Sequence, residues 1–367
     1  MRASVLAALT ASLAAGPALA ASSAKAPTAL ALTPLSVQAP GNGFQIVRGD
    51  AKGRIQLLTE DLELFSLTAS NALESEGRLK TDAVLGRPFQ PALSADGASW
   101  LAVTREGGVI EFDGTKGVPL PPPPLPPMIV TFLGSEPAIG SSLDPGRRTF
   151  LKPHFGGDTP YLLRLSGSDW DAVLTSSGSE QDELEDLLET SLLAAPDTKS
   201  GRLWVAKEYV FDVRKLSPAG KELLKVTRPR LRAADQPDPA KEAALQQELE
   251  KKGIQPGRVT SVVSIPEALV RALAVWTGDA YLLVAEADGG SYALYRVAGD
   301  TGEVARARIE VERPERILSM AARDEGLVLA GARATHGLWS VRWSALEPLW
   351  RPVPESSSEN SSVPTDQ

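Results

Sequence analysis

The stretch LLVAEADGGSYALYRV, from Leu282 to Val297, is followed about 45 residues later by LVLAGARATHGLWSVR, from Leu327 to Arg342. Each stretch has two apolar runs around a glycine-containing centre, and the apolar positions coincide; Leu294, for example, aligns with Trp339. Apolar runs rich in valine, leucine and aromatic residues on either side of a short turn are typical of paired antiparallel strands. The chain therefore repeats a strand–turn–strand unit at a fixed spacing.

A repeat of roughly 40–50 residues has the length of one four-stranded blade of a β-propeller. Such a unit cannot bury its apolar face alone and must pack against copies of itself. The segment from Phe44 to Trp350 holds about 300 residues, enough for five or six blades once non-repetitive segments are set aside. We predict an all-β fold, a β-propeller with six blades preferred over seven, and a strand near Phe44 that closes the ring by pairing with the last blade.

Two earlier segments repeat the end of this unit: YLLRLSGSDWDAVL at 161–174 and LWVAKEYVFDVRKLSPAGKELLKV at 203–226. In each, a glycine follows one apolar run and precedes the next, as expected for an outer strand, a turn and a return strand. The matching glycines are Gly167 with Gly299 and, one residue out of step, Gly220 with Gly302.

The segment PALSADGASWLAV, from Pro91 to Val103, contains the turn Ser94-Ala95-Asp96-Gly97 before an apolar strand. It resembles the WD-repeat-like turn in the propeller domain of the periplasmic Tol-system protein, where P-x-x-S-P-D-G-x-x-L-A-[FV] recurs in each blade. Here Ala95 stands where that family has proline. A looser similarity links KLSPAGKEL, at 215–223, to blade ends of six-bladed NHL-type propellers. Both resemblances imply an architecture and identify no subfamily.

Residues 1–20 have the composition of an export signal. Arg2 precedes an apolar run from Val5 to Ala15, and Ala18-Leu19-Ala20 provides small residues at the positions that signal cleavage requires. The run is too short to span a bilayer. We expect cleavage before Ala21, a periplasmic or secreted mature protein and no transmembrane segment after cleavage; a retained N-terminal anchor is the alternative.

The remaining chain divides by composition. Residues 21–42 are predicted to be a flexible leader, residues 43–352 the β-propeller domain, and residues 353–367 a disordered tail. Two segments have a helical pattern, namely Ser179–Leu193, with leucines at helical intervals, and Asp238–Gly253, with aspartate and proline at its start and glycine at its end. We expect these to be two short helical insertions in loops.

The proline-rich segment GVPLPPPPLPPM, from Gly117 to Met128, is predicted to adopt polyproline II, because prolines cannot donate to a sheet ladder. Its structural interpretation is a stiff spacer between blades, and its functional alternative is a ligand for an aromatic groove. Several tryptophans fall in predicted strands, where packing between blades accounts for them. These are Trp100, Trp204, Trp276, Trp339 and Trp343.

Charge and cysteine content exclude several classes of partner and site. The formal net charge is −8 at pH 7, which gives no electrostatic reason to expect nucleic acid or anionic lipid. The chain has no cysteine, so disulfides, thiolate metal sites and lipid-modified cysteine are excluded. Asp288-Gly289-Gly290 and Asp300–Glu303 lack the spacing of a calcium loop and are predicted to be hairpin turns.

Residues able to perform catalysis are sparse. The chain has two histidines, His154 and His336, and no G-x-S-x-G segment marks a nucleophile. We predict no catalytic, cofactor-binding or metal-binding residues, and no cofactor. An enzyme working from the central channel would require His154, Asp158, Arg164, Arg296 and His336 to converge at one channel end.

The sequence thus favours an exported, monomeric β-propeller that acts as a protein- or ligand-binding or scaffold module in the cell envelope. Its partner would be another envelope or secreted protein, bound by loops of one face together with the helical insertions. The alternatives are a propeller enzyme, as a hydrolase, lyase or quinone-type oxidoreductase, and a structural module of a larger envelope complex.

Overall fold

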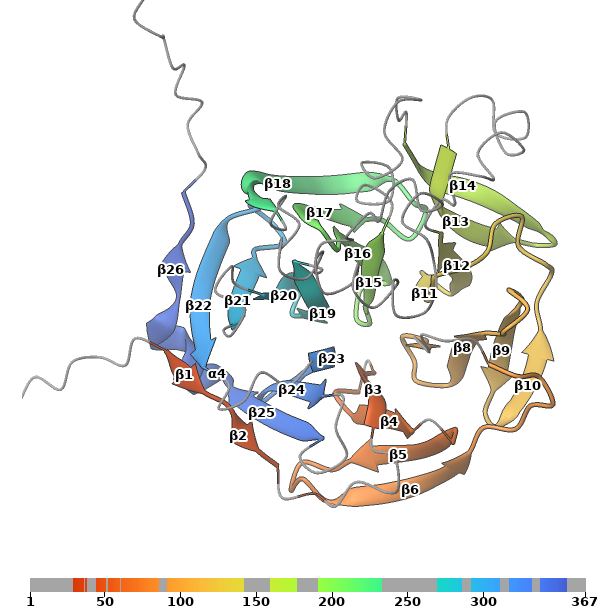
Figure 1. The fold of residues 1–367 in the computed structure, drawn as a ribbon, viewed down its shortest axis with the longest axis horizontal. Helices are drawn as coiled ribbons and strands as arrows, with labels where there is room; N and C mark the ends of the chain where they lie inside the picture. The colour runs from red at the N-terminus through yellow and green to blue at the C-terminus, as the bar shows by residue number, and fades with distance from the viewer. Residues whose placement is uncertain are drawn as a thin grey trace, which may run out of the picture.

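The computed structural model describes residues 29–35, 37, 44–50, 52–59, 61–85, 91–141, 159–176, 191–232, 269–285, 292–310, 317–331 and 337–354. Across these residues, six separate sheets surround a central axis, as Figure 1 shows. We call them blades 1 to 6, in the order in which the chain reaches their innermost strands. The predicted all-β, six-bladed propeller is confirmed.

Each blade is an antiparallel meander that runs outward from the axis. Blade 1 contains β3 (Phe44–Gly49), β4 (Ile55–Thr59), β5 (Glu63–Leu67) and β6 (Leu73–Arg78). Blade 2 contains β7 (Ala92–Leu93), β8 (Ser99–Val103), β9 (Val109–Asp113) and β10 (Lys116–Pro119). Blade 3 contains β11 (Ile129–Leu133), β12 (Glu136–Gly140), β13 (Thr159–Ser166) and β14 (Asp169–Ser176).

The second half of the ring follows the same plan. Blade 4 contains β15 (Leu192–Asp197), β16 (Arg202–Lys207), β17 (Val210–Leu216) and β18 (Glu222–Arg232). Blade 5 contains β19 (Val270–Trp276), β20 (Asp279–Ala285), β21 (Tyr292–Val297) and β22 (Val304–Glu310). Blade 6 contains β23 (Ile317–Arg323), β24 (Gly326–Gly331) and β25 (Leu338–Arg342), with β2 (Thr33–Pro34) as its outermost strand.

The repeat found in the sequence corresponds to equivalent strands. Its two copies are the second and third strands of blades 5 and 6. The alignment of Leu294 with Trp339 is one residue out of step with the ladders, because Leu294 lies opposite Leu283 and Trp339 lies opposite Leu329. The two side chains therefore enter the same apolar layer from opposite sides, Leu294 from blade 5 and Trp339 from blade 6. The turn glycines are equivalent as well. Gly220 and Gly302 have φ values of 83° and 76°, in the left-handed region that favours glycine.

The core consists of apolar layers between neighbouring blades. Trp100 and Phe112, from blade 2, pack with Leu58 of blade 1, and Trp204 of blade 4 packs with Leu282 of blade 5. Trp100 and Trp204 are at most 1% exposed, and Trp339 is buried between blades 5 and 6. Burying such side chains stabilises each interface by roughly 25 cal/mol per Å² of apolar surface. The interpretation of these tryptophans as packing between blades is confirmed.

The ring closes through the N-terminal segment. β2, which lies within the predicted flexible leader, pairs with β25 through Thr33 and Pro34, and the Leu35 N–H donates to the Leu338 carbonyl at 2.9 Å. The prediction that a strand near Phe44 closes the ring is wrong, because β3 is the innermost strand of blade 1. A two-residue strand has too little alternation to be recognised in sequence, and its proline is tolerated at a sheet edge.

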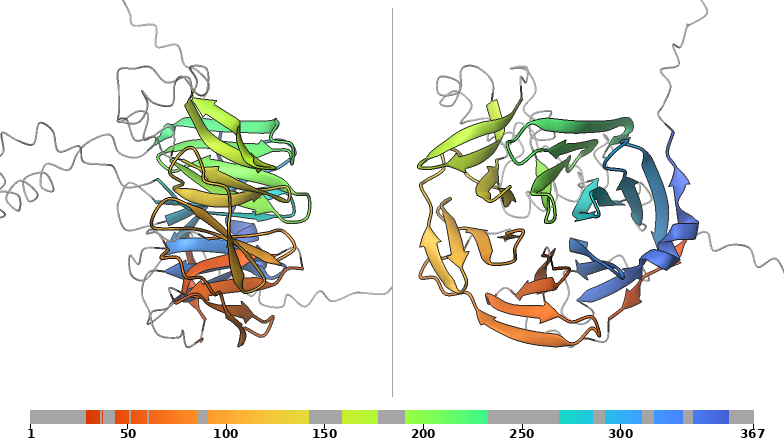
Figure 2. Two further views of the ribbon diagram at one scale, coloured as in Figure 1. Left: turned by 90° about the vertical axis from the view of Figure 1, so that its right-hand side faces the viewer. Right: turned by 180° about the vertical axis from the view of Figure 1, so that it is seen from behind.

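Both ends of the described chain reach the outer edge of blade 5. β1 (Leu30–Ala31) pairs in parallel with the end of β22, and β26 (Arg351–Pro352) pairs antiparallel with its beginning. Between β25 and β26, the chain forms α4 (Trp343–Leu346) and the 3-10 helix η3 (Glu347–Leu349). Trp343 therefore begins a helix and does not lie in a strand as predicted. Figures 1 and 2 show both terminal segments beside this blade.

The structure tests the non-repetitive segments in part. The predicted helical insertions lie outside the described residues, except that Leu192 and Leu193 begin β15. The proline-rich segment connects blades 2 and 3, as the spacer interpretation requires. Its first residues, Gly117–Pro119, belong to the edge strand β10 and not to a polyproline II run. The Trp170 Nε1–H donates to the Pro121 carbonyl at 3.1 Å, which attaches the segment to blade 3.

The turn at Ser94–Gly97 joins β7 to β8, as its resemblance to propeller turns implies. The Ser94 hydroxyl donates to Asp96 Oδ1 at 2.6 Å, and the Ala98 N–H donates to the same oxygen at 3.0 Å. The Ser99 N–H donates to Ser94 Oγ at 2.8 Å, and Gly97 has a φ of 75°. The two polar side chains therefore satisfy the backbone of the turn.

This turn predicts a specific pH dependence. The hydrogen bond from Ser94, supported by the Ala98 N–H, lowers the pKa of Asp96 below its ordinary value. The ionised Asp96 carboxylate therefore stabilises the fold at pH values above the pKa of an aspartate in the unfolded state, about 3.9. This stabilisation is lost as the pH falls through the lower pKa of Asp96 in the folded state. We expect the drop in melting temperature between about pH 6 and pH 3 to be smaller in Asp96→Asn than in the wild type. Asp300→Asn, in a blade 5 turn, is the control, and an equal drop in both variants would contradict the assignment.

Candidate functional site

The two faces of the ring differ in their connections. In blades 1 to 5, the turns from the first to the second strand and from the third to the fourth lie at the same end, and in blade 6 the β23–β24 turn lies at this end as well. We call this end the turn face; Figure 2 shows the ring from the side and from behind. The strand ends at the opposite face border most of the internal segments that lie outside the described ranges. The predicted binding surface of loops and helical insertions therefore lies largely outside the described residues.

A groove lies at the seam between blade 6 and blade 1. Its two adjoining parts have volumes of about 280 and 540 Å³. We call them together the seam groove. Both parts are lined by Asn71 from the β5–β6 turn and by the end of β25, and the larger part also contacts β2. The lining residues common to the two parts are Asn71, Ser340, Val341 and Arg342. Volumes in this range are typical of ligand and peptide sites.

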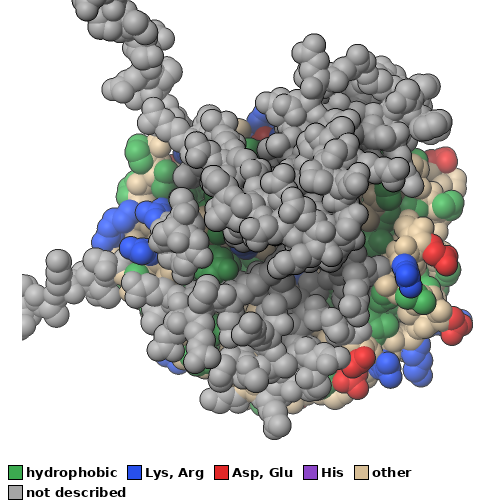
Figure 3. Space-filling model, in the orientation of Figure 1, with side chains coloured by type: hydrophobic (Ala, Val, Ile, Leu, Met, Phe, Trp, Pro, Cys, Tyr) green, Lys and Arg blue, Asp and Glu red, His purple; other side chains and the backbone are tan. Residues whose placement is uncertain are grey.

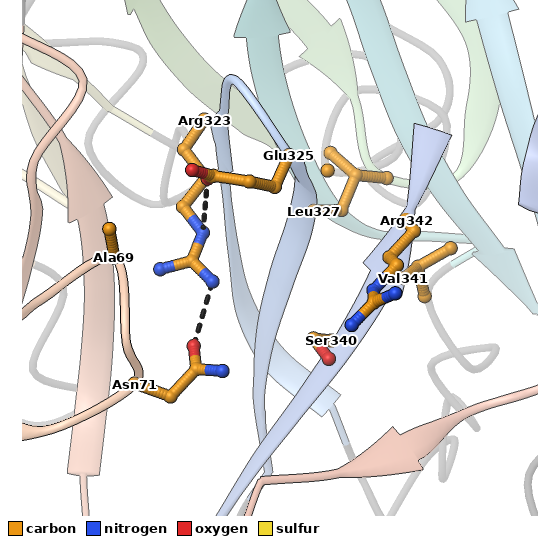
Figure 4. A pocket seen from close by; sticks show the side chains of 9 residues that line it. Ala69, Asn71, Arg323, Glu325, Leu327, Ser340, Val341 and Arg342 are labelled. Atoms are coloured by element: carbon orange, nitrogen blue, oxygen red, sulfur yellow. Dashed lines mark hydrogen bonds and ion pairs between the residues drawn. The ribbon is translucent and has the colours of Figure 1, made fainter. Parts of the chain in front are cut away.

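Arg323 forms one wall of the seam groove and joins the two blades. Figure 4 shows its side chain extending from the β23–β24 turn toward Asn71. Its Nη2 donates to Asn71 Oδ1 at 2.7 Å, and its Nη1 donates to the Thr68 carbonyl at 3.2 Å. Glu325 pairs with its Nε at 3.1 Å. Because Arg323 is only 7% exposed and its charge is paired, it positions the wall and contributes no free charge.

Asn71 is held in place by its own turn. Its φ of 62° lies in the left-handed region, which asparagine tolerates better than most residues. The Asn71 N–H donates to the Thr68 carbonyl at 2.9 Å, and the Ala72 N–H donates to Thr68 Oγ1 at 2.9 Å. The turn therefore presents the Asn71 carboxamide to Arg323 without rearrangement.

The opposite wall carries a free charge and an open strand edge. Arg342 is exposed, and no ion pair involves it among the described residues. β2 pairs with β25 only at Trp339 and Ser340. In the described chain, Val341 and Arg342 thus have no outer neighbouring strand. The groove combines a cationic side chain with a short sheet edge that an extended segment can join.

The convergence expected of an enzyme is not found among the described residues. Arg164 lies in β13, the third strand of blade 3, and pairs with Glu136 at 3.2 Å. Arg296 lies in β21, the third strand of blade 5, and pairs with Asp279 at 3.4 Å. Figure 1 shows these strands in separate blades, each outside its first two strands. His154, Asp158 and His336 lie outside the described residues.

Other predicted chemistry is tested only in the described chain. Asp300 lies in the turn between β21 and β22, as predicted, whereas Asp288 lies outside the described residues. Among the described residues, no group of three or more His, Cys, Asp or Glu side chains is placed to hold a metal ion. Within the same residues, no helix has the length and apolar character needed to cross a bilayer.

Basic side chains gather at one part of the rim. Figure 3 shows them beside the edge of blade 5, where β22 and β26 lie. Arg306 and Arg308 of β22 and Arg351 of β26 belong to these strands, and Arg306 lies directly opposite Arg351 in the ladder. These residues, like Arg323 and Arg342, carry no local signal in the sequence, because their positions depend on the packing of blades and on how the C-terminal segment meets blade 5.

No protein-family model and no curated protein matches the chain. Among solved structures, it is similar to a chain in the crystal structure of the mitotic checkpoint complex, with 12% identity, 93% of this chain and 100% of that chain covered, and a TM-score of 0.46. A Bacteroides thetaiotaomicron VPI-5482 protein of unknown function is 10% identical, with 84% and 75% covered and a TM-score of 0.48. The Myceliophteria thermophila Cps50 (Swd1) β-propeller domain is 11% identical, with 84% and 99% covered and a TM-score of 0.41. At these values the similarities carry no inference about binding, and the propeller assignment rests on the sheet topology.

Proposed function

We propose that this protein is an exported β-propeller that acts as a protein-binding or scaffold module in the cell envelope. In this proposal, the seam groove binds an extended segment of another envelope or secreted protein. The observation that carries it is the juxtaposition, in one groove, of an open end of β25 with the free cation of Arg342. Backbone hydrogen bonds to a strand edge supply affinity, and adjacent side chains supply selectivity.

The charge of the groove indicates the kind of segment that it accepts. Arg323 is already paired with Glu325, so among the described residues that line the groove Arg342 is the cation available to an incoming carboxylate. Leu30 and Leu35 contribute apolar surface beside it. We therefore infer a segment with a β-strand conformation, at least one acidic residue and a neighbouring apolar side chain.

Site-specific crosslinking in the native host tests this function. A photoreactive residue at Ser70, which is exposed and lines the groove, is expected to crosslink one partner protein. Arg342→Glu should reduce that product at least about tenfold, because it replaces an attraction by a repulsion. The matched control is the same photoreactive residue at Val118, which is 51% exposed on the outer strand of blade 2. Identical products from both positions, or a product unaffected by Arg342→Glu, would refute the proposal.

Export is supported by the signal-like composition of residues 1–20 and by where the strands begin. The first described strand starts at Leu30, so cleavage before Ala21 leaves every described strand in the mature chain. We expect the mature protein in the periplasmic or secreted fraction, with Ala21 at its N-terminus by mass spectrometry. Replacing Ala20 with arginine should block processing, because the cleavage site requires a small residue there. An unprocessed wild-type chain in the cytoplasm would contradict this part of the proposal.

A further inference from the structure

The central channel contains a small cavity lined by the innermost strands. Its volume is about 40 Å³, and blades 1, 2, 4, 5 and 6 contribute to its wall. Small residues form much of this wall, among them Gly49, Ala194, Ala274 and Ala321. The cavity therefore has room for a group of a few heavy atoms and excludes a sugar or nucleotide.

Arg48 is the basic side chain that lines this cavity. The Arg48 side chain is half-buried. Its Nη1 donates to Ser319 Oγ at 2.8 Å and to the Val47 carbonyl at 3.1 Å. Ser319 is oriented by blade 1 in turn, because its hydroxyl donates to the Val47 carbonyl at 3.0 Å and accepts the Val47 N–H at 3.2 Å.

One side of the Arg48 guanidinium remains unused. Among the described residues, no acceptor binds its Nε or Nη2, and no carboxylate pairs with it. Asp50 lines the same cavity, but its carboxylate accepts the Lys52 and Arg54 N–H groups and pairs with Arg54 Nε at 2.7 Å. Asp50 is therefore committed to its own turn and does not neutralise Arg48.

The remaining polar groups that line the cavity in the described part of the chain do not supply a negative charge. Thr198 is neutral. The indole ring of Trp276 is also uncharged, and the Lys199 ammonium, a further cation, lies 4.7 Å from its centroid. Burial lowers the pKa of Arg48 to about 10, so the guanidinium is still charged at neutral pH. A partly buried charge that has no counter-charge among the described residues is costly, and an anion that enters the cavity relieves that cost.

We propose that the central channel binds a small carboxylate anion through the Nε and Nη2 groups of Arg48. These two donors form the planar fork that matches two carboxylate oxygens. The small cavity admits a carboxylate of acetate or formate size beside the fork. This site is separate from the seam groove and is independent of the function proposed for it.

Thermal unfolding of the mature protein with sodium acetate, acetamide and sodium chloride tests this site. At constant ionic strength, acetate should raise the melting temperature with saturation, because it binds the folded state only. Acetamide has nearly the same shape without the charge and should have no such effect. Equal responses to acetate and acetamide, or to acetate and chloride, would overturn the proposal.

Variants of Arg48 identify the binding group. Arg48→Met keeps much of the side-chain volume; it should unfold at a higher temperature than the wild type without acetate and lose the acetate response. Arg48→Lys keeps the charge but lacks the fork, so acetate affinity by calorimetry should fall at least about tenfold. Arg351→Met, at the exposed rim, should keep the full response. If Arg48→Met does not fold, Arg48→Lys decides, and an unchanged acetate affinity in it would refute the assignment.

Discussion

A chain that lacks residues 1–36 is expected to unfold about 5–8 °C below a chain that begins at Ala21. The deletion removes β1 and β2, and with them the strand that completes blade 6. It also removes Leu30 and Leu32, which pack between blades 5 and 6, and Leu35, which packs between blades 6 and 1. Partial burial of three leucines together contributes about 3–5 kcal/mol, which corresponds to this shift for a domain of about 300 residues.

The truncated chain should also change its state of association. Loss of β2 leaves the whole outer edge of β25 unpaired, and exposed edges pair with other chains. Light scattering after size exclusion should show dimers or larger species of the 1–36 deletion, while the chain beginning at Ala21 remains monomeric. Equal melting temperatures for the two chains would show that the N-terminal strands do not close the ring.

Gly299→Ala is expected to destabilise the protein by about 3 kcal/mol or more. A Cβ at this position would lie 2.1 Å from the Gly278 carbonyl oxygen and 2.8 Å from Lys215 Nζ. Both contacts are too close, and the first involves backbone that cannot rotate away. The β21–β22 turn must then move, which breaks the hydrogen bond from the Gly299 N–H to Asp279 Oδ1, now 2.8 Å.

The same movement would leave a buried cation unsatisfied. Lys215 is 2% exposed, and its Nζ donates to the Gly299 carbonyl at 3.0 Å and to the Gly278 carbonyl at 3.4 Å. Its ammonium also lies 5.3 Å from the ring centroid of Trp204. Displacement of the turn removes acceptors from a group that water does not reach, and such a loss is among the costly effects of single substitutions.

Gly167→Ala is the matched control, because the sequence aligns Gly167 with Gly299. Its φ of 64° carries a strain of about 1 kcal/mol for alanine, but nothing lies within 4 Å of the added Cβ. The free energy of unfolding measured in urea should therefore be much lower for Gly299→Ala than for Gly167→Ala. Similar losses in the two variants would contradict the close approach of the two turns.

The closure of the ring explains how both chain ends stabilise one blade. β1 and β26 pair with opposite ends of β22, so blade 5 is completed by residues from the two ends of the described chain. α4 and η3 lie between these contacts, and Leu346 and Leu349 are buried against blades 5 and 6. The segment that leads away from β25 is thus part of the propeller core and not a simple tail.

The sequence by itself determined the all-β class, the repeat and several turns, and it favoured six blades without fixing their number. The paired strands of the repeat, β20 with β21 and β24 with β25, and the turn at Ser94–Gly97 depend on contacts within one hairpin. Alternating apolar residues and turn-forming glycines record such contacts directly, so they are readable without coordinates. The proline-rich spacer could also be located locally, because prolines cannot donate to a sheet ladder. Its first residues nevertheless form an edge strand.

Only the tertiary structure decided which strand closes the ring and where the binding features lie. β2 pairs through Thr33 and Pro34 with residues of β25 that are about 300 positions away in the sequence. A pattern of two residues is too short to predict such a partner. Gly167 and Gly299 look alike in sequence, yet only Gly299 approaches the backbone of another turn. In the sequence, Arg48 and Arg342 look like ordinary strand residues. In the structure, neighbouring blades surround Arg48, whereas Arg342 is exposed at the seam groove. These properties arise from packing between distant segments, which depends on the whole ring and not on local sequence.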